Sequence, residues 1–239
     1  TRDQVRYAKP DPDLFIAAAE KLGVDIAHSL VIGDSITQGG GYVRAMDAVF
    51  AQQYPDLKLP PIINAGISGN KAEDLIARFE KDVVQRRPTW VFINVGINDV
   101  WHRLAQPHDE KVLATYKANL ERMVTMAREA NIRVVLLAPT VIEEDAKAEG
   151  NRRLALYVQA GKEVAAKNRC DYVDLHELFL RTIAVHRKQH PEAGTKGHLT
   201  TDGVHMTPAG NTLMAIGILR ALGVSDEKMA ATKLDEVFR

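Results

Sequence analysis

The chain alternates between short apolar runs and longer amphipathic stretches. Apolar runs that end at glycine, proline or a polar corner predict buried strands, here at residues 30–32, 61–66, 90–95, 133–138 and 172–175. Stretches with apolar residues at helical spacing predict helices at residues 12–22, 42–53, 72–85, 109–130, 149–167 and 208–222. Strands that alternate with helices predict an α/β fold with a doubly wound parallel sheet and right-handed crossovers.

Two segments fall outside this alternation. Residues 181–201 are rich in His, Lys and Gly and predict a polar loop. Within it, residues 184–201 are the expected specificity element, because function concentrates on long loops over a rigid scaffold. Residues 225–239 predict either a final helix packed on the domain or a partner surface. No repeat, low-complexity tract or linker interrupts the pattern, which favours one domain over residues 1–239.

The composition of the chain excludes some classes of function. The chain has 239 residues and is 46% hydrophobic, enough to bury a sizeable core. Lys plus Arg and Asp plus Glu balance at 31 each, so no charge excess favours a nucleic-acid partner. The apolar runs are strand-sized, so no membrane span is expected. The single cysteine, Cys170, excludes an internal disulfide, and the oligomeric state stays open.

The compartment also stays open. Thr1 rather than Met begins the sequence, which is compatible with removal of a leader or tag. Many exported proteins lack disulfides, so both the cytoplasm and export remain as alternatives for a soluble protein.

Four polar corners follow predicted strands or precede a predicted helix. They contain Ser35, Gly69, Asn98 and the pair Asp202 and His205. A parallel sheet brings such corners together at the edge formed by the carboxyl ends of its strands. Acyl transfer needs a hydroxyl nucleophile, a base, a group that orients the base, and donors for the developing oxyanion. The corners hold residues suited to each of these roles.

Several neighbouring residues have two interpretations each. Asp34 is either a helix or turn cap or a contact to substrate, and Asp99 either caps a helix or anchors its loop. Gly66 is expected to be an ordinary turn glycine. Trp101 is either a wall of the acyl or sugar pocket or part of the core, and His102 is a candidate substrate contact.

The remaining candidates near the site are weaker. His198 is expected close to it, and Tyr42 and Val43 are expected to shape the same cleft because they follow the Ser35 loop. The other histidines considered are expected to be solvated; these are His28, His176, His186 and His190.

The four corners together resemble the sequence blocks of the SGNH (GDSL-type) hydrolases, in the family's order. The blocks are Gly33-Asp34-Ser35, Ile67-Ser68-Gly69-Asn70, Gly96-Ile97-Asn98-Asp99 and Asp202-Gly203-Val204-His205. The resemblance covers about residues 30–222 and implies a flavodoxin-like three-layer α/β/α sandwich with a five-stranded parallel sheet. It implies a catalytic triad of Ser35, Asp202 and His205, with Ser35, Gly69 and Asn98 forming the oxyanion hole. No metal or organic cofactor is implied.

The expected reaction is ester hydrolysis through an acyl-Ser35 intermediate. The short connections leave little sequence for a lipid lid, which favours small acyl groups such as acetate on a carbohydrate. The alternatives are a lysophospholipase or thioesterase, and a carbohydrate-binding protein that keeps the site as a relic.

The first 35 residues also resemble part of the haloacid-dehalogenase-type phosphatases. In that family, the lysine at the position of Lys9 contacts the phosphoryl group and the aspartate at Asp34 helps to hold Mg²⁺. The family's Asp-x-Asp nucleophile motif after an apolar strand is absent from the sequence, so phosphatase activity is not expected. We hypothesise that residues 1–33 are a helix-strand segment grafted onto an SGNH hydrolase, making the chain a chimera.

Overall fold

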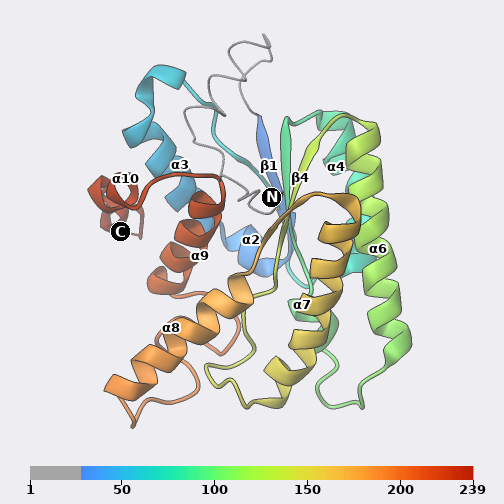
Figure 1. Ribbon diagram of the computed structural model, residues 1–239, viewed down its shortest axis with the longest axis vertical. Helices are drawn as coiled ribbons and strands as arrows, with labels where there is room; N and C mark the ends of the chain where they lie inside the picture. The colour runs from blue at the N-terminus through green and yellow to red at the C-terminus, as the bar shows by residue number, and fades with distance from the viewer. Residues whose placement is uncertain (1–27, 239) are drawn as a thin grey trace, which may run out of the picture.

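The computed structural model describes residues 28–238 and has a single parallel sheet at its centre (Figure 1). The strand order is β2-β1-β3-β4-β5, and every neighbouring pair is parallel. The strands are β1 (Ser29–Gly33), β2 (Ile63–Gly66), β3 (Trp90–Asn94), β4 (Arg133–Leu137) and β5 (Asp171–Val173). This confirms the five-stranded parallel sheet that the sequence predicts.

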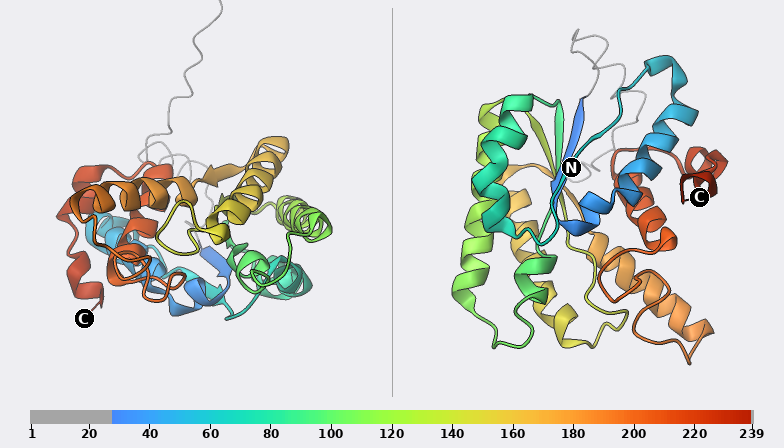
Figure 2. Two further views of the ribbon diagram at one scale, coloured as in Figure 1. Left: turned by 90° about the horizontal axis from the view of Figure 1, so that it is seen from below. Right: turned by 180° about the vertical axis from the view of Figure 1, so that it is seen from behind.

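Helices cover both faces of the sheet. The longer ones are α3 (Gly41–Gln53), α4 (Ala72–Asp82), α6 (Glu110–Glu129), α7 (Glu149–Asn168), α8 (Leu175–Gln189) and α9 (Pro208–Ala221). The shorter ones are α2 (Ser35–Gly39), α5 (Ile97–Trp101) and α10 (Asp226–Ala231), with 3₁₀ turns η1 (Pro55–Leu57), η2 (Val84–Arg86) and η3 (Leu234–Phe238). Helices α4, α6 and α7 form one layer, and α3 and α9 lie on the opposite side of the strands (Figures 1 and 2). The molecule is therefore a three-layer α/β/α sandwich.

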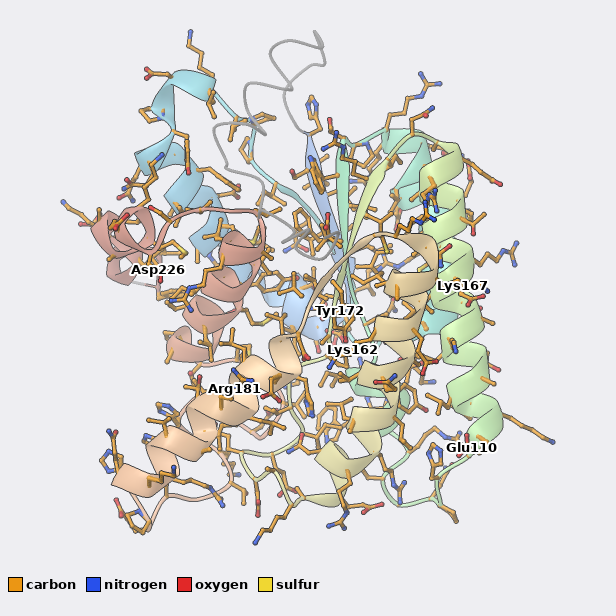
Figure 3. The ribbon with its side chains drawn as sticks, viewed as in Figure 1. Glu110, Lys162, Lys167, Tyr172, Arg181 and Asp226 are labelled. Atoms are coloured by element: carbon orange, nitrogen blue, oxygen red, sulfur yellow. The ribbon has the colours of Figure 1, made fainter. Side chains whose placement is uncertain are left out.

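Charged side chains join α6 and α7 at the surface of their layer. Figure 3 shows Lys167 of α7 beside α6. Its ammonium lies 3.1 Å from the carboxylate of Glu121 of α6. A second pair joins Lys117 of α6 to Glu163 of α7 at 2.6 Å. These ion pairs are exposed to solvent, so we expect each of them to add little to the stability of the α6–α7 packing.

Helix α8 differs from the prediction. Residues 181–189 belong to this helix rather than to the predicted loop, so the long loop begins only at His190. The apolar residues Leu175, Phe179 and Ile183 are spaced by four and all buried, whereas the His, Lys and Arg residues give the segment its polar composition. Leu175 begins this helix and is not the end of the fifth strand, because Asp174 caps the helix by accepting the N–H of Glu177 (3.0 Å).

The C-terminal residues pack on α3, as one of the two alternatives for residues 225–239 predicts. The Met229 side chain of α10 is buried. The Lys228 ammonium lies 3.9 Å from the ring centre of Tyr54, and the N–H of Lys233 donates to Gln52 Oε1 (3.1 Å).

The predicted helix at residues 12–22 and Lys9 lie outside the described residues. The apolar run at residues 30–32 does form β1, which pairs with both β2 and β3 in the interior of the sheet. The grafted-segment hypothesis therefore stays a prediction. Between residues 28 and 238, no helix combines the length and the apolar character needed to cross a membrane.

Candidate active site

Strand β1 delivers Ser35 to the start of the short helix α2. Asp34 caps this helix, with its Oδ1 accepting the N–H of Ile36 (3.0 Å). Because Ser35 occupies the first helical position, its own N–H has no partner within the helix. Gly33 allows the close packing of this turn, since a Cβ at that position would collide with Thr37 Oγ1 and the carbonyl oxygen of Asn94.

The imidazole of His205 lies between Ser35 and Asp202. Its Nε2 is 2.9 Å from Ser35 Oγ, although 170 residues separate the two along the chain. Its Nδ1 is 2.7 Å from Asp202 Oδ2. The other carboxylate oxygen of Asp202 accepts the backbone N–H groups of Val204 (2.9 Å) and His205 (2.8 Å). This local turn fixes Asp202 against the ring, which favours an imidazole that donates from Nδ1 and accepts from Ser35 at Nε2.

The Asp202 carboxylate stays charged across the neutral range. Partial burial raises its pKa, but the hydrogen bonds from the His205 backbone and ring and from the Val204 N–H outweigh burial and lower the pKa to about 2. A charged Asp202 can stabilise an imidazolium on His205 when the ring accepts a proton.

The corner at residues 67–70 lies beside the serine turn. The N–H of Ile67 donates to the carbonyl of Gly33 (3.0 Å), and the N–H of Ser68 donates to Gln38 Oε1 (2.7 Å), so the corner is held to both β1 and α2. Gly69 has φ +79°, and a Cβ there would meet no atom within 4 Å. Its N–H donates to no protein oxygen in the described part of the chain.

Asn98 lies in α5, directly after β3, and contacts the same corner. Its Nδ2 donates to the carbonyl of Asn70 (3.1 Å), and its side chain is buried. The structure therefore brings together Ser35, Gly69, Asn98, Asp202 and His205 at the carboxyl ends of β1, β2 and β3. The free N–H groups of Ser35 and Gly69, with the second Nδ2 hydrogen of Asn98, are the donors available to an oxyanion.

Two buried carboxyl groups lie beneath the site. Asp34 is 1% exposed, its Oδ2 has no partner among the described residues, and burial raises its pKa to about 6. Both oxygens of Asp99 lie 3.3 Å from the N–H of Ala72, and burial raises the pKa of Asp99 to about 7. The capping interpretation of Asp34 and the anchoring interpretation of Asp99 are confirmed. A direct contact of Asp34 with substrate stays a prediction.

Aromatic residues flank the base. The Trp101 ring is half-buried and meets the His205 ring edge to face, with centroids 5.9 Å apart. It also touches exposed His102, at 5.6 Å between centroids. These positions fit the predicted substrate contacts, which themselves stay predictions. His198 stacks on His186 of α8 at 3.7 Å.

Two predictions for residues near the site are wrong, and a third is confirmed. The Tyr42 and Val43 side chains are buried in the core, and the Tyr42 hydroxyl shares a 2.8 Å hydrogen bond with Thr37, so neither shapes an open cleft. His176 is buried rather than solvated, and its Nδ1 lies 2.5 Å from the carbonyl oxygen of Thr140. Burial lowers the pKa of His176. Gly66 is confirmed as structural, because a Cβ there would collide with the backbone of Gln38.

Two residues near the site are absent from the sequence-based predictions. Arg78 of α4 donates to the carbonyl of Gly33 (3.0 Å), to Asn70 Oδ1 (2.9 Å) and to Asp82 Oδ2 (2.8 Å). Its position three residues after buried Leu75 is a signal that a cation faces inward. Glu144 accepts hydrogen bonds from residues 198–200, and nothing in its polar loop sets it apart in the sequence.

Comparison with known proteins places the chain in one family and finds relatives with esterase names. Residues 31–213 match the GDSL-like Lipase/Acylhydrolase family. The acetylxylan esterase of Geobacillus stearothermophilus is 31% identical over 226 residues, which are 87% of this chain and 96% of that protein. The uncharacterized lipoprotein YqeF of Bacillus subtilis (strain 168) is 28% identical over 142 residues, which are 57% of this chain and 56% of that protein.

Solved structures give the same likeness. The crystal structure of an acetyl xylan esterase, AlAXEase, matches with a TM-score of 0.72 and 32% identity, over 81% of this chain and 98% of that chain. The crystal structure of the acetylxylan esterase from Geobacillus stearothermophilus matches with a TM-score of 0.71 and 31% identity, over 82% of this chain and 94% of that chain.

Proposed function

Since the chain belongs to the GDSL-like lipase/acylhydrolase family and is a carboxylic ester hydrolase, we propose that it removes acetyl groups from carbohydrates through an acetyl-Ser35 intermediate. The observation that carries this proposal is the unbroken chain of contacts from Ser35 Oγ to His205 Nε2 (2.9 Å) and from His205 Nδ1 to Asp202 Oδ2 (2.7 Å). The acetylxylan esterase relatives support the choice of acetylated sugars as the substrate class.

The first half-reaction transfers the acetyl group to the enzyme. His205 Nε2 takes the proton from Ser35 Oγ as that oxygen bonds to the ester carbonyl carbon. The negative charge on the carbonyl oxygen faces the N–H groups of Ser35 and Gly69 and the amide of Asn98. The carbon–oxygen bond to the sugar then breaks, and the imidazolium gives its proton to the leaving hydroxyl.

The second half-reaction regenerates the serine. His205 takes a proton from a water molecule as the water oxygen attacks the acetyl carbon of acetyl-Ser35. The bond to Ser35 Oγ then breaks, Ser35 recovers a proton from His205, and acetate leaves. Asp202 holds the ring in one tautomer throughout and stabilises the imidazolium that forms in each half-reaction.

The test measures acetate release from acetylated xylo-oligosaccharides and hydrolysis of p-nitrophenyl esters of increasing chain length. We expect rates that fall with chain length, and we expect them to vanish in Ser35→Ala. Ser68→Ala is the matched control, because Ser68 is exposed on the neighbouring corner and its hydroxyl makes no contact to His205. It should keep wild-type activity.

The alternatives predict other results. Preference for long acyl chains or thioesters would contradict a deacetylase and favour a lysophospholipase or thioesterase. If neither the wild type nor Ser35→Ala hydrolyses any ester, and both still bind sugar, the result would favour a carbohydrate-binding relic. Mg²⁺-dependent phosphate release that survives in Ser35→Ala would point to the phosphatase.

A further inference from the structure

The segment that carries two of the three triad residues has little regular structure. Residues 190–207, here called the triad loop, connect α8 to α9 and include only an isolated antiparallel bridge between Thr200 and Met206. Asp202 and His205 lie in the turn between these two bridged residues. A loop of this kind holds a fixed shape only if contacts from elsewhere in the fold restrain it.

Glu144 supplies the largest set of such contacts. Its side chain is 3% exposed, and it comes from the connection between β4 and α7. The Oε1 atom accepts the backbone N–H groups of His198 (3.2 Å), Leu199 (2.8 Å) and Thr200 (2.7 Å). It also accepts the hydroxyl of Thr200 at 2.8 Å. One buried carboxylate oxygen therefore gathers four donors from three consecutive residues of the triad loop.

The backbone beside Glu144 adds two further bonds to the same loop. The N–H of Glu144 donates to the carbonyl of Thr195 (2.6 Å), and the N–H of Glu143 donates to the carbonyl of Gly203 (2.7 Å). Gly203 lies between Asp202 and His205, so this second bond reaches the turn that joins the two triad residues.

The Glu144 connection is itself fixed from α7. The buried side chain of Asn151 accepts the N–H of Ile142 (2.9 Å) through Oδ1. Its Nδ2 donates to the carbonyls of Glu143 (3.0 Å) and Asp145 (2.8 Å). The turn that carries Glu144 is thus held to the first turn of α7 by three hydrogen bonds from one buried side chain.

The anchored residues connect directly to the base. Thr200 neighbours Thr201, whose N–H donates to the carbonyl of His205 (2.7 Å). On the other side of the bridge, the N–H of Thr207 donates to the carbonyl of Leu199 (2.9 Å). A shift of residues 198–200 would therefore move the backbone on both sides of the His205 ring.

We propose that Glu144 is a positioning residue for the triad, holding residues 198–200 so that His205 and Asp202 stay aligned with Ser35. This role rests on the proposed function, since it assumes that the alignment serves acyl transfer. Glu144 touches neither Ser35 nor the His205 ring and acts only through the triad loop.

The test compares Glu144→Ala and Glu144→Gln with wild type, well below each variant's melting temperature. A phosphonate probe titrates the reactive serine, and p-nitrophenyl acetate turnover is expressed per titrated site. We expect Glu144→Ala to lower kcat per site by roughly 10- to 100-fold with little change in KM, because small misplacements of catalytic groups carry losses of that order. Glu144→Gln keeps an oxygen acceptor at the same place and should recover most of the loss.

Amide hydrogen exchange gives a readout that needs no esterase activity. Exchange in the triad loop should accelerate in Glu144→Ala and stay close to wild type in Glu144→Gln. Glu143→Ala is the matched control, because Glu143 is exposed and engages the triad loop through its backbone N–H. If Glu144→Ala does not fold, Thr200→Val removes the hydroxyl bond alone and should give a smaller change in the same direction.

The outcomes separate the positioning role from the proposed function. If Glu144→Ala keeps the kcat per titrated site of the wild type and only its melting temperature falls, Glu144 serves stability alone and the proposal is overturned. Unchanged exchange in the triad loop would also overturn it. Full ester hydrolysis by Ser35→Ala would refute the proposed function, whereas faster exchange in Glu144→Ala would still support the anchoring contacts.

Discussion

Single atoms at the candidate site have separable tasks. Under the proposed mechanism, Ser35 supplies a hydroxyl and an N–H, Gly69 supplies an N–H, and Asn98 supplies a side-chain amide that also donates to the Asn70 carbonyl. Of these donors only the Asn98 amide belongs to a side chain, so a substitution can remove it alone, whereas the N–H groups of Ser35 and Gly69 belong to the backbone. Asn98 is therefore the position at which a single substitution tests one donor.

Asn98→Ala should lower kcat for acetyl esters by about 10²–10³-fold, because it removes one donor from the developing oxyanion. KM and the far-ultraviolet circular dichroism spectrum should change little. Asn168→Ala is a suitable control, since it removes an amide at the C-terminal end of α7. An unchanged kcat in Asn98→Ala would exclude the amide from the oxyanion hole.

Residue identities could be predicted where a motif and a strand end coincide. Ser35, Gly69 and Asn98 follow from that coincidence, whereas Asp202 and His205 follow from a motif just before a predicted helix, and the structure brings all five together. The role of Glu144 could not be predicted, because its partners are backbone N–H groups that any sequence would offer. The burial of His176 is not predictable for a related reason, since its partner is the backbone carbonyl of Thr140.

At the scale of elements, Arg78 joins three parts of the sandwich. It lies on α4 and reaches the end of β1, the corner after β2 and its own helix at Asp82. Its side chain is 14% exposed and that of Asp82 is 16% exposed, so the ion pair is largely removed from water. Removal of one partner from such a pair leaves an unpaired charge behind.

Arg78→Ala should destabilise the fold by roughly 3 kcal/mol, because it breaks a mostly buried ion pair and removes the donor to Asn70 Oδ1, whereas the carbonyl of Gly33 keeps its hydrogen bond from the N–H of Ile67. Arg78→Lys should recover only part of this, since an ammonium cannot reach three divergent acceptors as a guanidinium does. Urea unfolding measures both. Exposed Arg86 on the adjacent turn gives the control substitution Arg86→Ala, and an equal loss there would contradict the role of Arg78.

Element boundaries were predictable where apolar periodicity dominates and not where composition misleads. The composition of α8 favours a loop for residues 181–189, because its exposed side carries His, Lys and Arg and only Ile183 among these residues is buried. The sequence pattern predicts only polar corners where the structure has the short helices α2 and α5. Each has five residues, which is too few for a periodic pattern to appear.

At the scale of the whole molecule, buried Asp99 couples global stability to pH. Its pKa lies at about 7 in the fold, against an ordinary 3.8. Between these values the folded state binds more protons than the unfolded chain, so this group stabilises the fold fully below about pH 4 and loses that contribution as the pH rises to about 7.

Asp99→Asn should remove this dependence, because the amide keeps an oxygen for the N–H of Ala72 and cannot ionise. The melting temperature of wild type minus that of Asp99→Asn should fall between about pH 4 and pH 7 and level off above. Asp34 is present in both proteins, and its charge is one of the smaller causes that raise the pKa of Asp99. A difference that rises with pH, or stays constant, would contradict a raised Asp99 pKa.

The separation of 170 residues between Ser35 and His205 orders events in time. Ribosomes make the nucleophile 170 residues before its base, so an emerging chain carries the serine without a general base until His205 is made and the triad loop has folded. Closing contacts over such long sequence separations is slow compared with forming helices. Enzymatic turnover is therefore a late signal of maturation, and during refolding it should return only after the helical circular dichroism signal has recovered.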